Sequence, residues 1–523
     1  MMKTILILAL VFMGFVAPVS ASQVAGSVAV GLIPIQHGGR IKPFAAFAHE
    51  LVQSITGKAR WQGSPAVDVI MSRLARPEQF LDVPFIRIDH PGLKEALGIL
   101  SEKKSVSYHE LQPVFKTLES IVAQASVKRQ KEERLSALEQ QADILYERLA
   151  TVDRLSRGEM ITVMPVPGKT AWASPFTSNM VQSKYFLQLV KNYADKDPKI
   201  VTQVDLWIAS VVPSLEKDGW EKVKMEGIYY AMEPFYYAGI LYLIGFILLV
   251  FSGLRMPDAG CLALFIGFVF HTAGLLLRTY ILSRPPVANM YETMIFMDWV
   301  LMICVGCYAI FQKRRSFLSS GALASVLVML YANLLPVSSS LDVLSPVLRS
   351  SYWLMIHVMT IMASYSFFTL AMAISHRYLF LAATGKLTAD EDKGSALAIY
   401  RILQAGLIAL GAGTILGGVW ANETWGRFWG WDPKETWAFI TFLGYMAILH
   451  LRYSRKLTNW GLAVASLLGF LLVLMTWYGV NFVLGRGLHS YGAGSGGLEW
   501  IMLFLVLEAG FLGGMIYLRK RRG

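Results

Sequence analysis

Four histidines in the second half of the chain stand in or beside long apolar runs. His271 and His450 fall inside such runs, whereas His357 lies near the end of one and His489 lies in the polar segment that follows another. An imidazole in the hydrocarbon of a membrane is costly, so it marks a functional site. Neutral imidazole is a good ligand of haem iron, and two opposed imidazoles make a six-coordinate b-type centre. For any one of these histidines, a hydrogen bond to a neighbouring helix is the open alternative.

A tryptophan-rich segment, residues 417–437, lies between two of the apolar runs. Its indoles are Trp420, Trp425, Trp429, Trp431 and Trp437. Tryptophans are common at membrane surfaces, but this density, with two glycines that let a ligand approach the backbone, indicates a binding surface for a flat apolar molecule such as a porphyrin. Arg427 and Lys434 are candidate partners of its carboxylates. Asp432 is expected to orient the turn or accept hydrogen bonds rather than act as a base.

The elements that must position these residues are membrane-spanning helices. The chain is 54% hydrophobic and only 16% charged, against about 25% charged residues in an ordinary soluble protein. A spanning helix needs about 20 apolar residues. We predict about nine spans, at 235–254, 259–280, 290–311, 317–336, 352–382, 399–420, 435–453, 459–484 and 498–518. The predicted fold class is an all-α polytopic membrane protein with an N-terminal, exported, mainly helical soluble domain.

The N-terminal 21 residues are typical of a secretory signal peptide. One lysine precedes an apolar stretch that ends in Val19-Ser20-Ala21, which is the order of regions in such a signal. An uncleaved anchor is the alternative. We therefore expect an exported domain over 22–233, with a helical charged stretch at about 113–157. This domain contains no cysteine, so it has no disulfide framework.

The distribution of lysine and arginine predicts the orientation of the membrane domain, 234–523. Basic clusters at 313–315, 452–456 and 519–522 would all face the cytoplasm if the N-terminal domain is exported and nine spans follow. The C-terminus is then cytoplasmic, and the tryptophan-rich segment lies on the outer side. The same clusters account for the net charge of +12, so no nucleic-acid partner is expected.

Several motifs together resemble one family, the CcsA (ResC) proteins of the System II pathway of cytochrome c synthesis. The segment WGRFWGWDPKETW resembles the family's tryptophan-rich WWD signature. Flanking motifs resemble the family in the same order: RPPVANMYETMIF (284–296), SYWLMIHV (351–358), WAFITFLGYMAILHLR (437–452) and YGVNFVLGRGLHSYG (478–492). The resemblance covers about 259–518, over half of the chain.

The resemblance implies that the chain holds haem b, transiently and without a covalent bond. In the family two membrane histidines ligate an inner haem, and two external histidines ligate haem against the WWD loop. By motif, the inner pair is His271 with His450 and the outer pair is His357 with His489. The implied cofactor-binding residues of the loop are Trp420, Trp425, Trp429, Trp431, Asp432 and Arg427. No catalytic residue is assigned.

The resemblance also implies a reaction and its partners. The family is thought to move haem outward and to present it for thioether attachment to an apocytochrome c with a CxxCH motif, so cytochrome c synthase (haem lyase) activity within a complex is expected. The implied partners are a CcsB (ResB)-type membrane subunit, the apocytochrome, a thiol-reducing protein of the periplasm and membrane lipids. The implied location is the inner membrane of a bacterium. Residues 22–233 do not resemble CcsB, so their role is not predicted.

Three other functions remain open at this stage. A haem exporter would use the same ligands without any ligation step. A b-type cytochrome that transfers electrons would share the membrane histidines but gives no reason for an outer tryptophan-rich loop. A protein of the related CcmF or CcmC branch would keep the assembly role, although the GLHSYG and NMYET segments favour CcsA.

Overall fold

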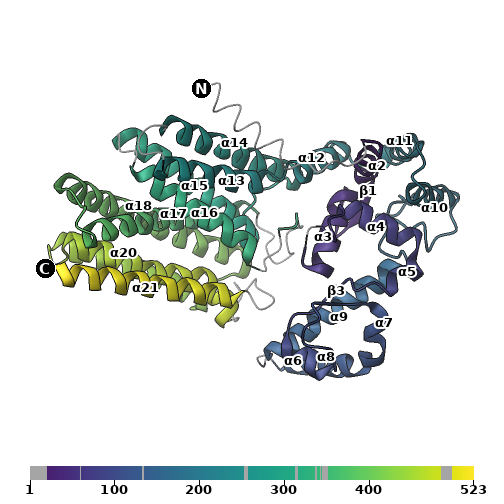
Figure 1. The fold of residues 1–523 in the computed structure, drawn as a ribbon, viewed down its shortest axis with the longest axis horizontal. Helices are drawn as coiled ribbons and strands as arrows, with labels where there is room; N and C mark the ends of the chain where they lie inside the picture. The colour runs from purple at the N-terminus through teal and green to yellow at the C-terminus, as the bar shows by residue number, and fades with distance from the viewer. Residues whose placement is uncertain are drawn as a thin grey trace. The chain divides into compact units, whose positions relative to one another are not determined.

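The computed structural model describes residues 21–58, 60–131, 133, 135–251, 257–312, 316–335, 339–341, 343, 351–484 and 497–522. The chain divides into two compact units, Met1–Met232 and Glu233–Gly523. Helices make up most of the described residues in both units (Figure 1). The predicted signal peptide lies almost wholly outside the described residues.

The first unit is a helical domain with two small antiparallel hairpins. Its α-helices are α2 (Ala21–Gly31), α3 (Phe44–Thr56), α4 (Ala66–Ala75), α5 (Pro77–Leu81), α6 (Pro91–Ala96), α7 (Tyr108–Leu111), α8 (Phe115–Gln130), α9 (Ala137–Ser156), α10 (Val181–Ala194), α11 (Ile200–Val211) and α12 (Gly219–Met232). Short 3₁₀ turns, η1 (Gln112–Val114) and η2 (Val212–Ser214), follow α7 and α11. One core of buried aliphatic and aromatic side chains runs from Val30 to Val211, as a domain with its own hydrophobic core requires.

The β1–β2 hairpin of the first unit is closed by a turn of two glycines. Strand β1 (Pro34–His37) pairs with β2 (Arg40–Pro43), and β3 (Ile86–Arg87) pairs with β4 (Ser105–Val106). The β1–β2 turn is Gly38-Gly39, and both glycines have positive φ angles, 61° and 78°. That conformation matches the twist of a two-residue hairpin and is strained for other residues.

The charged stretch predicted as helical is two helices rather than one. A break after Gln130 separates α8 from α9, because Ser136 and Glu139 form a capping box that starts a new helix. The Ser136 side chain accepts a hydrogen bond from the Glu139 N–H, and the Glu139 carboxylate accepts one from the Ser136 N–H at 2.7 Å. Such a box satisfies backbone N–H groups that have no partner inside the helix.

The second unit is a bundle of long apolar helices. They are α13 (Pro234–Phe251), α14 (Pro257–Leu282), α15 (Met290–Gln312), α16 (Ser316–Leu334), α17 (Ser351–Ala383), α18 (Ala389–Trp425), α19 (Pro433–Tyr453), α20 (Asn459–Leu474) and α21 (Leu498–Arg522). A π-helical segment, η4 (Met475–Leu484), continues α20. Among the described residues, eight helices are long and apolar enough to cross a membrane, which confirms the predicted all-α membrane fold.

Helix α19 is not among these eight. The seventh predicted span does form a helix of 21 residues, but polar residues at both ends lower its apolar content: Lys434 and Glu435 at the start, His450 and Arg452 at the end. Its passage across the membrane therefore stays a prediction, and so do the count of nine spans and the side on which the C-terminus lies.

Helix α17 is the central element of the second unit. It packs against α15, α16, α18, α20 and α21, while α13 packs against α14 and α16 (Figure 1). Small residues let α17 and α18 approach closely: a Cβ on Gly406 would lie 2.6 Å from the Phe368 ring, and one on Gly413 would lie 2.7 Å from the Ile361 side chain. Close packing at small residues is the usual way that membrane helices associate.

Candidate functional site

The tryptophan-rich loop is short and tightly held. Helix α18 continues to Trp425, and Gly426 ends it with a positive φ of 71°, the usual helix-ending conformation of glycine. Helix α19 starts at Pro433, so the extended part is only 426–432, shorter than the loop predicted at 417–437. Trp431 has a φ of 57°, a conformation rare for side-chain-bearing residues and found mainly where neighbouring contacts impose it.

Asp432 and Glu435 impose this conformation. Asp432 Oδ1 accepts hydrogen bonds from the backbone N–H groups of Lys434 (2.9 Å) and Glu435 (3.0 Å), so it caps α19. Glu435 accepts one from the Gly430 N–H at 2.7 Å and pairs with Arg427 at 3.1 Å. Asp432 thus has the hydrogen-bonding role that the sequence indicated, whereas its contact with a cofactor stays a prediction.

A pocket opens beside this loop. It encloses a space of about 1090 Å³, which includes open solvent at its mouth. Its walls come from α17 and α18, from the loop with the start of α19, from η4, and from the 287–293 segment between α14 and α15. Most of the lining is apolar.

His357 is the histidine on the wall of this pocket. Its Nδ1 lies 2.7 Å from the carbonyl oxygen of Gly413. A carbonyl only accepts, so Nδ1 carries the proton, and Nε2 of the neutral ring keeps its lone pair. The ring lies parallel to the Trp420 indole, with 6.3 Å between centroids and 9° between planes. An N–H donated to a carbonyl is the usual arrangement that orients a metal-binding histidine.

The pocket brings together only some of the predicted tryptophans. Trp420 is buried, lines the pocket and meets Trp425 edge-on at 4.8 Å. Trp429 also lines the pocket, and its buried indole N–H has no hydrogen-bond partner among the described residues. Trp431 is 67% exposed. Trp425, Trp431 and Arg427 are not among the described residues that line the pocket.

The predicted inner pair is not brought together. His271 is fully buried; its Nε2 lies 3.0 Å from the Ile295 carbonyl oxygen and its Nδ1 lies 3.2 Å from the Tyr242 hydroxyl. Both ring nitrogens are therefore engaged within the bundle. His450 is exposed on α19, and its Nδ1 donates to the Met446 carbonyl at 2.9 Å. None of the contacts in the described part of the chain joins these two histidines.

The second predicted outer ligand, His489, lies outside the described residues. Other histidines, in the first unit, have structural partners or buried surroundings. His90 caps α6 and His109 pairs with Asp82 at 2.7 Å. Burial lowers the pKa of His37 and of His49, which favours their neutral forms. The described residues hold no cluster of His, Cys, Asp or Glu suited to a metal ion.

Sequence reasoning missed several residues of the pocket. Glu435 organises the loop, and the order Asp432-Pro-Lys-Glu435 is a capping-box signature that could have revealed it. Asn481, from η4, accepts a hydrogen bond from Lys434 Nζ at 3.2 Å. An asparagine inside an apolar run is a signal of the same kind as a membrane histidine. The 287–293 wall carries no comparable signal.

The residues present fit haem. The pocket offers an imidazole with its proton on Nδ1, which makes Nε2 the nitrogen that can ligate a metal, a parallel indole beside it, and a mostly apolar lining. The Trp429 N–H is a donor for a carboxylate of the ligand. Planar apolar groups with a few polar substituents match such a lining.

Comparison with known proteins agrees with this geometry. The family described as "Cytochrome C assembly protein" matches residues 287–489, which include the pocket. CcsA of Panax ginseng is 31% identical over 280 residues, covering 45% of this chain and 85% of that protein. CcsA of Prochlorococcus marinus strain MIT 9215 is 34% identical over 262 residues, covering 44% and 83%. The chain belongs to the cytochrome c assembly protein family. The predicted resemblance is thereby confirmed.

A further member of the cytochrome c assembly family covers more of the chain. The protein NrfI of Wolinella succinogenes is 30% identical over 492 residues, which is 87% of this chain and 53% of NrfI. The chain therefore spans about half the length of NrfI. A match of that extent exceeds the second unit alone, so the first unit also has a counterpart there. Its role is still not defined by this likeness.

Proposed function

We propose that this protein acts in cytochrome c biogenesis by binding haem b in the pocket beside the tryptophan-rich loop and presenting it for thioether attachment to a CxxCH apocytochrome c. Family membership supports the assembly role. The observation that carries the haem site is the His357–Gly413 hydrogen bond, since a proton on Nδ1 makes Nε2 the nitrogen that can ligate iron, in a residue that lines the pocket together with Trp420 and Trp429.

The residues of the pocket would share the work of holding the ligand. His357 Nε2 is the proposed axial ligand of the iron, and His489 the proposed second one. Trp420 and Trp429 supply apolar faces, and the Trp429 N–H and Lys434 Nζ are donors for its carboxylates. When bound, haem supplies the vinyl groups to which the two acceptor thiols add.

The rest of the proposal concerns the assembly. His271 and His450 remain proposed ligands of an inner haem; His271 would have to give up its Tyr242 contact, and His450 would meet its iron on the outer surface of the bundle. A polar side chain exposed at membrane depth is normally covered by another protein segment. This favours a separate membrane subunit of the CcsB type. We further propose a thiol-reducing protein as a partner, and a bacterial inner membrane with the loop on the periplasmic side.

A histidine replacement with chemical rescue tests the outer site. The full chain, co-produced with its membrane partner, is purified with and without His357→Gly, and haem is measured per protein. We expect the variant to lose most of its haem and its bis-imidazole spectrum, and added imidazole to restore both in part. His376→Gly is the matched control, because His376 lies on the same helix and pairs with Glu508 at 3.0 Å.

The same strains separate presentation from simple export. Yield of covalent cytochrome c is measured beside the haem content of the purified protein. Haem loading without any covalent cytochrome in the wild-type strain would indicate a carrier only. A wild-type protein that neither contains nor takes up haem would exclude the proposed function.

A further inference from the structure

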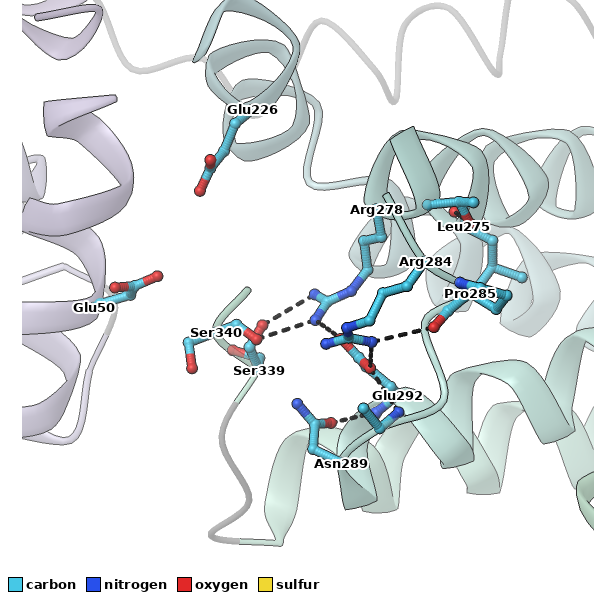
Figure 2. A network of polar contacts seen from close by, with 12 residues as sticks. Glu50, Glu226, Leu275, Arg278, Arg284, Pro285, Asn289, Glu292, Ser339 and Ser340 are labelled. Atoms are coloured by element: carbon cyan, nitrogen blue, oxygen red, sulfur yellow. Dashed lines mark hydrogen bonds and ion pairs between the residues drawn. The ribbon is translucent and has the colours of Figure 1, made fainter. Parts of the chain in front are cut away.

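A buried ion cluster stands behind one wall of the pocket. Glu292, whose side chain is fully buried, lies 2.8 Å from Arg278 Nη2 and 2.9 Å from Arg284 Nη1 (Figure 2). Arg278 is 1% exposed and Arg284 is 8% exposed. Arg278 donates to one carboxylate oxygen, and Arg284 donates to both, at 2.9 and 3.5 Å; these are strong, charge-assisted hydrogen bonds.

The cluster holds backbone as well as side chains. Glu292 Oε2 accepts a hydrogen bond from the Ala288 N–H at 2.9 Å, and the Asn289 side chain accepts one from the Glu292 N–H at 2.8 Å. Arg278 donates to the carbonyl oxygens of Ser339 and Ser340 at 3.0 and 3.1 Å. Figure 2 shows these contacts converging from α14, the start of α15 and the 339–340 segment.

The segment that Glu292 holds is part of the pocket. Val287, Ala288, Asn289, Met290 and Thr293 all line it. Val287, Ala288 and Asn289 precede α15, which begins at Met290, and have no regular structure of their own, so their position depends on the contacts of their backbone. The opposite wall, with His357 and Trp420, is fixed by helix packing.

Burying these charges costs free energy, so the cluster adds little net stability to the loop that it holds. Buried charges lose their hydration, and an ion pair of this kind is often no more stabilising than apolar residues of the same size. What it does provide is a fixed geometry, because a bidentate guanidinium accepts few alternative arrangements. Removing the carboxylate would take away the negative charge that Glu292 supplies to these two buried cations.

We propose that Glu292, held by Arg278 and Arg284, is a positioning residue that sets the 287–293 wall at the distance from His357 that a planar ligand requires. This inference rests on the proposed haem site, because the wall can position a planar ligand only if haem binds in the pocket. The positioning itself is a property of the protein without ligand, so it can be measured separately.

The first arm measures the wall without haem. In a background lacking the native cysteines Cys261, Cys304 and Cys307, Ala288→Cys is introduced and its reaction with a maleimide is timed in the haem-free, detergent-purified full chain. We expect Glu292→Gln to speed labelling about tenfold, because the Ala288 backbone is no longer held and the wall opens locally.

Two further variants keep the test valid if Glu292→Gln does not fold. Glu292→Asp keeps the charge but shortens its reach, and Arg284→Lys keeps the charge but loses the two-pronged geometry. Both should label faster than the wild type, though less than Glu292→Gln. Asp298→Asn is the matched control for the labelling, since it removes another fully buried acid from α15, whose partners are Ser325 and, at 3.9 Å, His271, and which does not line the pocket. It should label at the wild-type rate.

The second arm titrates haem b into the same proteins and records the spectrum. Weaker haem retention, with a shift in the absorbance of the bound form, is expected for each variant that labels faster. Wild-type labelling in folded Glu292→Asp and Arg284→Lys proteins would overturn the positioning role. Faster labelling with unchanged haem retention and spectrum would also overturn it, because the wall would then not shape the site. If the wild type binds no haem, the proposed function fails, while the labelling result still reports on the wall.

Discussion

The carbonyl oxygen of Gly413 lies 2.7 Å from Nδ1 of His357 and so decides which nitrogen of the ring carries the proton. The contact joins α17 to α18, and it is possible because Gly413 and Gly417 have no side chains at the point where the helices meet. A Cβ on Gly417 would lie 2.6 Å from His357 Cε1. The histidine is thus oriented by helix packing rather than by the loop beside it.

Gly417→Ala should therefore disturb the histidine without removing it. The added methyl group must push the imidazole away from its hydrogen bond, and overpacking of this kind costs about 1–3 kcal/mol. We expect lower haem content and an altered spectrum in the purified protein. Gly510→Ala on α21 is the control, because nothing lies within 4 Å of the added Cβ there. A Gly417→Ala protein with normal haem content and spectrum would show that the ring position is not critical.

The orientation in the membrane can be tested with fusions to alkaline phosphatase, which is active only outside the cytoplasm. We expect activity for fusions after residue 230 and near residue 425, and none after residue 520. This follows from the positive-inside rule applied to the basic loops. An active fusion at the tail would mean that one predicted span, with α19 the first suspect, does not cross.

The sequence predicted the helices of the membrane unit because their signal is length and apolar composition, which the membrane itself demands. It also pointed to His357 and the tryptophans. It could not predict which indoles line the pocket. Trp420 and Trp431 both lie in the tryptophan-rich segment, but Trp420 is buried and Trp431 is 67% exposed. This difference depends on where Gly426 ends α18.

The residues that sequence reasoning missed act through tertiary contacts. Glu292 is one acid at the start of an apolar run, and its role depends on an ion pair with Arg278 from another helix. Likewise, an apolar sequence pattern around His271 cannot reveal that Tyr242 and the Ile295 carbonyl occupy both ring nitrogens. Such partners come from helices whose packing the local pattern does not encode.

The tryptophans should contribute to haem retention in proportion to their place in the pocket. Each stacked aromatic contributes about 0.5–1.5 kcal/mol beyond its buried area. Trp429→Ala should therefore lower haem per protein by a graded amount. Trp425→Ala should also lower haem per protein, because Trp420 loses the indole that it packs against. The double variant should lose more haem than either single variant. Trp431→Ala should have the smallest effect. Full haem loading with no covalent cytochrome c in the Trp429 variant would assign the loop to docking or chemistry instead.

Asp432 provides the last test, because two substitutions separate a cap from a base. Asparagine keeps an oxygen that can accept the Lys434 and Glu435 N–H bonds, whereas alanine removes it. Loss of such a cap costs about 1 kcal/mol. We expect Asp432→Ala to loosen the loop and lower both haem content and cytochrome c yield, and Asp432→Asn to stay near the wild type in both. If Asp432→Asn instead loads haem normally but forms no thioether bonds, the carboxylate takes part in proton transfer, and its role as a cap alone would be wrong.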